Sequence, residues 1–239
     1  MIGIGTIVNV LAVIFGSMIG ILFNGGLKQK YQDTLMQVLG LSTMFIGVSG
    51  TLKGMFIITN NAIETKGTML MIISLVLGAL IGEFIDIEDK MDRFGEYLKS
   101  KVKKVNNPRF VEGFVTSSIV ICVGAMAVVG SLQDGLIGDP SMLFTKSILD
   151  GIITIIFAST MGIGVLFSVI PLSLYQGTIT LCAKFVAPIL TETMITNLSF
   201  VGSVLIFGVG INIAFGKKFK VGNMLPALFI AIIGSVFIR

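Results

Sequence analysis

The chain has 239 residues, of which 54% are hydrophobic and only 13% are charged, and its formal net charge is +4 at pH 7. A soluble domain usually has about 25% charged residues, so this composition excludes an ordinary soluble globule. The small positive charge lies mostly in connecting segments, where basic residues orient membrane helices. It therefore indicates no nucleic-acid partner, and the lipid bilayer is the first predicted partner.

A helix needs roughly 20 apolar residues to cross the hydrocarbon core, and the chain contains several apolar runs close to that length. They predict one all-α transmembrane domain over residues 1–239, with about eight spans. The N-terminal run lacks a preceding basic region, so we expect a first span there and not a cleavable signal peptide. The predicted spans are Ile2–Phe23, Leu35–Ile58, Thr68–Ile85, Glu112–Gly130, Met142–Ile170, Leu172–Leu190, Leu198–Phe215 and Asn223–Ile238. The split at Pro171 predicts a tight turn, and a broken or re-entrant helix is the alternative.

Basic residues predict the orientation of these spans. Three connecting segments hold twelve of the 17 basic residues, namely Lys28 and Lys30, then Lys90, Arg93, Lys99, Lys101, Lys103, Lys104 and Arg109, then Lys217, Lys218 and Lys220. Because basic loops stay on the cytoplasmic side, both termini are expected outside, in a bacterial plasma membrane.

The segment from Asp86 to Asn107 has the pattern of an amphipathic helix. Its apolar residues recur every three or four positions, at Ile87, Met91, Phe94, Leu98, Val102 and Val105. Acidic residues come first and basic residues last, which suits the helix dipole. We expect a helix on the cytoplasmic membrane surface, within a cytoplasmic segment covering residues 86–109. The alternative is a stripe that packs against another subunit, in a homo-oligomer.

Small residues recur four positions apart in several spans. Phe15–Gly20 resembles Leu77–Gly82, and the same spacing separates Thr160 from Gly164 and Gly208 from Asn212. Such spacing lets helix backbones approach closely in lipid. The pattern is compatible with ordinary membrane packing and with internal repeats of a helix hairpin, which are frequent in transporters.

Ionisable groups inside spans are energetically unfavourable and therefore mark functional sites. Asp150 lies about two turns into the fifth span, four residues after Lys146 and on the same helix face. The pair predicts either a structural ion pair or a cation or proton site.

Other polar residues are candidates for the same transport path or ion site. Gln133 and Asp134 belong to a Gly-rich segment, residues 130–140, that is predicted either to line a cavity as non-helical backbone or to form an outer loop. Gln176 follows Pro171, and a helix break there would expose backbone groups. Asn9 and Asn212 are amides within spans, for which interhelical hydrogen bonding is the ordinary role.

No catalytic motif is visible, and an enzymatic function is not expected. The chain has no His, which excludes a His-based triad and His metal ligands. Cys122 and Cys182 are expected to be small buried hydrophobes. We predict neither a cofactor nor a metal site.

Several strings resemble the domain-of-unknown-function 554 (DUF554) family of bacterial inner-membrane proteins. They are Glu112-Gly113-Phe114, Cys122–Met126, Gly130-Ser131, Asp134-Gly135, Lys146-Ser147, Asp150-Gly151, Phe157–Ser159, Gly162–Val165 and Gln176-Gly177. The resemblance covers the whole chain and implies a bacterial plasma-membrane protein, without an implied substrate.

Together these features predict a transporter or channel for a small solute or ion, coupled to a proton or cation that Asp150 carries. The alternative is a non-transporting scaffold, assembly factor or sensor subunit that acts through its amphipathic helix.

Overall fold

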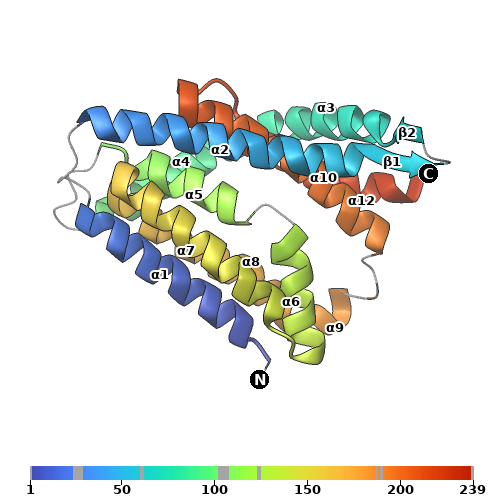
Figure 1. Ribbon diagram of the computed structural model, residues 1–239, viewed down its shortest axis with the longest axis horizontal. Coiled ribbons are helices and arrows are strands. Elements are labelled where there is room, and N and C mark those ends of the chain that lie inside the picture. The colour runs from blue at the N-terminus through green and yellow to red at the C-terminus, as the bar shows by residue number, and fades with distance from the viewer. Residues whose placement is uncertain are drawn as a thin grey trace. The chain divides into compact units, whose positions relative to one another are not determined.

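The computed structural model describes residues 2–23, 29–59, 62–101, 108–122, 125–186, 188 and 191–237, which are almost entirely α-helical (Figure 1). The elements are α1 (Ile4–Phe23), α2 (Gln29–Met55), β1 (Phe56–Thr59), β2 (Ala62–Thr65), α3 (Thr68–Ile85), α4 (Ile87–Lys101), α5 (Phe110–Cys122), α6 (Ala125–Ile137), α7 (Ser141–Met161), the 3-10 helix η1 (Gly162–Ser168), α8 (Val169–Leu181), α9 (Ala183–Val186), α10 (Glu192–Phe215), α11 (Val221–Met224) and α12 (Pro226–Phe237).

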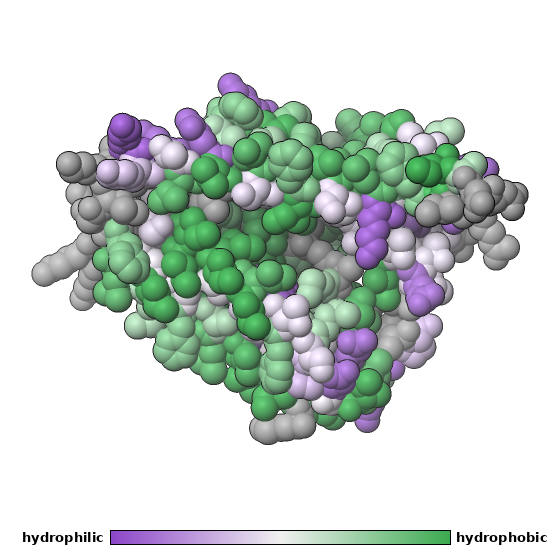
Figure 2. Space-filling model, in the orientation of Figure 1, coloured by the Kyte–Doolittle hydropathy of each residue, from purple (hydrophilic) through white to green (hydrophobic). Residues whose placement is uncertain are grey.

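The helices have the length and composition of membrane spans. Among the described residues, five helical stretches are long and apolar enough to cross a bilayer: Ile4–Phe23, Asp33–Met55, Thr68–Ile85, Ser141–Leu181 and Glu192–Phe215. A sixth is the pair Phe110–Cys122 and Met126–Ile137, which is bent by 61°. The face shown in Figure 2 is largely hydrophobic, as lipid contact requires. The all-α membrane class is confirmed, whereas this count gives five to six spans.

The helices form two compact units. Unit 1 contains residues 1–36, 90–122 and 126–189, and unit 2 contains residues 37–89, 123–125 and 190–239. Unit 1 is therefore built mainly from α1, α5, α6, α7 and α8, and unit 2 from most of α2 together with α3, α10, α11 and α12.

In unit 1, α1 lies parallel to α7. A Cβ built on Gly5, near the start of α1, would meet Leu143 near the start of α7, and one built on Gly20 would meet Ile155 and Ala158 near its end. The two helices lie side by side in Figure 1. Glycine at these positions allows the backbones to approach closely, as is common between membrane helices.

The chain reverses direction between α7 and α8. Thr6 of α1 contacts Thr180 at the end of α8, and Asn9 contacts Gln176 one turn earlier, so α8 is antiparallel to both α1 and α7. The turn is η1, which begins at Gly162 with φ 80°, a conformation that favours glycine. The predicted turn at Pro171 is wrong, because Pro171 lies in the first turn of α8, where its missing N–H removes no helical hydrogen bond.

The Gly-rich segment after α5 is helical. It was expected as non-helical backbone or a loop, yet α6 continues to Ile137, and the left-handed Gly138 follows it. The glycines serve close packing: a Cβ on Gly130 would meet Leu143, and one on Gly135 would meet the Thr180 carbonyl. Residues 123 and 124, at the bend between α5 and α6, lie outside the described residues.

Helix α4 begins with acidic residues and ends with basic ones. Gly95 packs against Val111 and Phe114 of α5, while the Phe94 ring meets Phe114 edge-on at 5.8 Å. Phe94 nevertheless remains 43% exposed. The last two members of the predicted apolar stripe, Val102 and Val105, lie outside the described residues.

In unit 2, α2 runs antiparallel to α10, because Gly40 approaches Ala214 whereas Gly54 approaches Phe200. The predicted second span included residues 56–58, but these form β1, which pairs antiparallel with β2 in the register Phe56↔Thr65. The sequence pattern of a β-hairpin is present here, as two short runs rich in Ile and Thr, Phe56–Thr59 and Ala62–Thr65, on either side of two asparagines.

The similar strings Phe15–Gly20 and Leu77–Gly82 both lie where helices pack closely, but in different arrangements. Gly20 faces the parallel helix α7, whereas Gly78 and Gly82 of α3 face Ala227 and Asn223. Leu70 packs against Gly234, so α3 is antiparallel to α12. The resemblance therefore reflects a shared packing requirement, and an internal repeat stays a prediction.

Candidate functional site

A charged pair lies inside unit 1. The Lys146 ammonium donates to both oxygens of Asp150, at 2.8 and 2.7 Å, within α7. The Asn9 side chain of α1 donates to Asp150 Oδ2 at 3.0 Å and to Gln176 Oε1 of α8 at 3.2 Å. These four residues, here called the central site, join three helices and are all buried.

Asp134 forms a second buried contact close to the start of α1. Its carboxylate accepts from the backbone N–H of Gly3 at 3.1 Å and from that of Thr6 at 3.2 Å. These N–H groups lie at the start of α1, where no intrahelical acceptor is available. The Thr6 and Thr180 hydroxyls share a hydrogen bond of 3.0 Å. Asp134 therefore positions α1, which carries Asn9 into the central site.

Some polar atoms around these contacts have no hydrogen-bond partner among the described residues. They include Asn9 Oδ1, Gln176 Nε2 and Ser131 Oγ, all of them buried. Buried polar atoms are nearly always paired, with protein or with water. The Asn9 acceptor and the Gln176 donor can thus form hydrogen bonds with a bound polar molecule or ion.

Each of the three helices contributes a polar stripe with helical spacing. On α1 the buried stripe includes Thr6, Asn9 and Ser17, and on α7 it includes Lys146, Asp150 and Thr154, while α8 contributes Gln176 and Thr180. Thr6, Thr180 and Ser131 were not predicted as site residues. Each of them lies three or four residues from a predicted site residue on the same helix. This spacing, which places both side chains on one helix face, could have identified them from the sequence.

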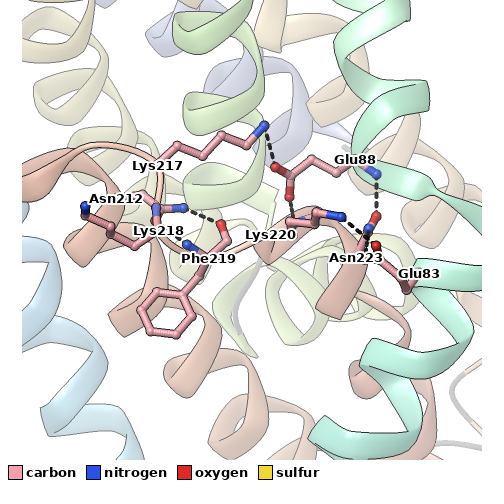
Figure 3. Close-up of polar contacts among 9 residues, drawn as sticks. Glu83, Glu88, Asn212, Lys217, Lys218, Phe219, Lys220 and Asn223 are labelled. Carbon is pink, nitrogen blue, oxygen red and sulfur yellow. Dashed lines mark hydrogen bonds and ion pairs between the residues drawn. The ribbon is translucent and has the colours of Figure 1, made fainter.

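Two candidates do not belong to the central site. Gln133 is half-buried on α6 beside Asp134 and takes no part in its contacts with α1. Asn212 lies near the end of α10 in unit 2, where it accepts from the Lys218 and Phe219 N–H groups and donates to the Phe219 carbonyl (Figure 3). It thus fixes the turn after α10, and the contacts that the described residues give it lie within that turn.

The same end of unit 2 contains a second polar network (Figure 3). Buried Glu88 pairs with Lys217 at 2.6 Å and accepts from the Gly222 N–H, and Asn223 accepts from the Glu88 N–H. Lys220 donates to Glu83, which raises the pKa of Lys220. This network connects the α3–α4 junction to the segment before α11, and its contacts hold these two segments together.

The central site holds one negative and one positive side chain in direct contact inside an apolar helix. Both Asp150 oxygens are occupied by the Lys146 ammonium. A cation or proton that bound Asp150 would compete with that ammonium for the carboxylate.

A family model described as "Protein of unknown function (DUF554)" matches residues 4–236. The chain is 34% identical over 226 residues to the uncharacterized membrane protein YdfK of Bacillus subtilis strain 168, covering 95% of this chain and 93% of that protein. It is 30% identical over 232 residues to the uncharacterized protein YqgA of Escherichia coli K12, covering 95% and 94%. No solved structure matches the chain.

Proposed function

The chain belongs to the DUF554 family, and from that premise we propose that it is a transporter or channel for a small solute or ion, coupled to a proton or cation. The observation that carries the proposal is the central site. Lys146 and Asp150 are 7% and 4% exposed, in the first half of an apolar helix. Charges within a span are unfavourable unless a function or a pairing retains them.

The open atoms at Asn9 and Gln176 favour transport over a purely structural ion pair. A structural ion pair needs only the contact between its own two charged groups. Here a buried acceptor, Asn9 Oδ1, and a buried donor, Gln176 Nε2, lie beside the pair without a hydrogen-bond partner among the described residues. The predicted helix breaks supply no backbone groups to this site, since residues 130–137 and 171–177 are helical; Gln176 contributes its side chain. The proposed mechanism therefore rests on side chains, with Asp150 as the coupling charge.

The test is flux into proteoliposomes that contain the purified protein, with and without a proton or sodium gradient, for wild type and Asp150→Asn. Gradient-dependent flux that the substitution abolishes supports the proposal. If neither protein transports any of a broad set of ions and small solutes, the scaffold function that acts through α4 replaces it.

Eight crossings in a bacterial plasma membrane, with both termini outside, are part of the proposal. The stretch Ser141–Leu181 supports two crossings because α7 and α8 are antiparallel. Pairing the bent α5 with α6, and α11 with α12, gives four passes in each unit. This arrangement puts Lys217, Lys218 and Lys220 on the cytoplasmic side.

Reporter fusions test this topology. A reporter fused after Arg239 is expected to lie outside, and a reporter inserted at Lys218 is expected to lie in the cytoplasm. The two positions are expected on opposite sides because α11 and α12 lie between them. The same side for both reporters would contradict eight crossings.

We also propose that α4 lies on the cytoplasmic membrane surface. Its Phe94 and Tyr97 rings are 43% and 55% exposed, which suits partial burial among lipid headgroups. A spin label at Phe94 is expected to be less accessible to a water-soluble relaxation agent than a label at Lys101. Equal, full accessibility at both positions would exclude a surface helix.

A further inference from the structure

A cavity of about 740 Å³ opens at one end of unit 2, whereas the central site belongs to unit 1. The end of α2, the β1–β2 hairpin and the starts of α3 and α10 surround it, so we call it the hairpin cavity. Its lining includes two lysines, Lys53 and Lys66, and one acidic residue, Glu192. The volume lies within the range of small-molecule sites, roughly 300–1,000 Å³.

The two lysines have no carboxylate partner among the side chains that the structure describes. Lys66 immediately follows β2, and Lys53 lies in the last turn of α2. Two ammonium groups against one carboxylate give the lining a net positive charge. The cavity is therefore suited to an anion.

The starts of two long helices add hydrogen-bond donors to the same cavity. The N-cap of α3 is Gly67, with φ 77°, and no side chain caps its first turn, so those N–H groups lack a side-chain acceptor. On α10, the Thr191 hydroxyl satisfies only the Met194 N–H, at 3.2 Å. Helix N-termini favour anions through these N–H groups and through the helix dipole.

We propose that the hairpin cavity binds a phosphate oxyanion, either free or as the headgroup of an anionic phospholipid. Lysine ammonium groups and helix N-termini are both established phosphate ligands in proteins. The apolar side chains in the lining, among them Phe56, Ile57 and Met194, provide contact for an organic group esterified to the phosphate. The inference is independent of the transport function.

The experiment uses the full chain in phosphatidylcholine nanodiscs, titrated with inorganic phosphate and followed by 31P NMR. The double variant Lys53→Gln/Lys66→Gln is expected to weaken binding by about tenfold or more, because charge-assisted hydrogen bonds are lost. Glu192→Gln is expected to tighten binding severalfold, because it removes the one acidic group among the described lining residues. Lys184→Gln, an exposed lysine outside the lining, is the control and is expected to bind as wild type does.

A second arm distinguishes the two sources of phosphate. Native mass spectrometry measures how much phosphatidylglycerol each protein retains from mixed nanodiscs. Retention that the double variant loses, without phosphate binding in the first arm, assigns the cavity to a lipid headgroup and supports the proposal. Unchanged phosphate binding and unchanged lipid retention in the double variant would overturn it, and so would an equal loss in Lys184→Gln. Equal unfolding temperatures among the variants establish that the differences concern binding.

Discussion

Asp150→Asn is expected to abolish gradient-dependent flux and also to lower the stability of the protein. The substitution keeps the shape of the side chain and one acceptor for the Asn9 amide, but it removes the charge that holds the Lys146 ammonium at 2.7 Å. Leaving one member of a buried ion pair alone costs about 3–5 kcal/mol. A thermal unfolding curve in detergent should therefore shift to lower temperature, alongside the loss of flux.

A second variant separates the two effects. Lys146→Met/Asp150→Asn removes both charges, and replacement of a buried pair by uncharged groups is often neutral for stability. We expect the double variant to unfold near the wild-type temperature and still to show no coupled flux. Normal coupled flux through this stable double variant would establish that the pair only holds α7 in place.

Asp134 provides the comparison for a carboxylate that positions a helix. It is fully buried and accepts from two backbone N–H groups at the start of α1. Its two oxygens are therefore satisfied by backbone donors, whereas Asp150 faces a side-chain cation. This difference identifies Asp150 as the better candidate for exchange with a guest, although both acids were candidates in the sequence.

The membrane class and much of the central site could be predicted because each depends on local sequence. Apolar runs fix the helices, and Asn9, Lys146, Asp150 and Gln176 were recognisable as polar groups inside them. That they meet depends on the parallel packing of α1 and α7 and on the reversal at η1. Neither is encoded in the spacing within any single helix.

The incorrect predictions at residues 130–140 and at Pro171 share a physical cause. Glycine and proline have two roles in membrane helices, breaking the helix or allowing close packing, and a sequence alone does not distinguish them. Gly130 and Gly135 pack against α7 and α8, and Pro171 occupies a first turn, where it is harmless. The actual reversal uses Gly162 at positive φ, where only the backbone conformation reveals the role.

Gly20→Ala is expected to disrupt the packing of α1 on α7, whereas Gly177→Ala is expected to be harmless. A Cβ at Gly20 would collide with the carbonyl oxygen of Ile155 and approach the Ala158 methyl group. Backbone cannot rotate away as a side chain can, so the helices must separate, at a cost of about 1–3 kcal/mol or more. Asn9 lies on the same face of α1, and its contacts with Asp150 and Gln176 should loosen with it.

Gly177 is the matched control because it is also a helical glycine of unit 1, next to a central-site residue, yet nothing lies within 4 Å of its hypothetical Cβ. Alanine there should raise stability by up to about 1 kcal/mol through helix propensity alone. Unfolding temperatures in detergent should therefore fall for Gly20→Ala and hold or rise for Gly177→Ala. If the two variants shift alike, the close approach of α1 to α7 is wrong. In that case the central site loses the helix that supplies Asn9, because Asp150 and Gln176 are joined only through that residue among the contacts described.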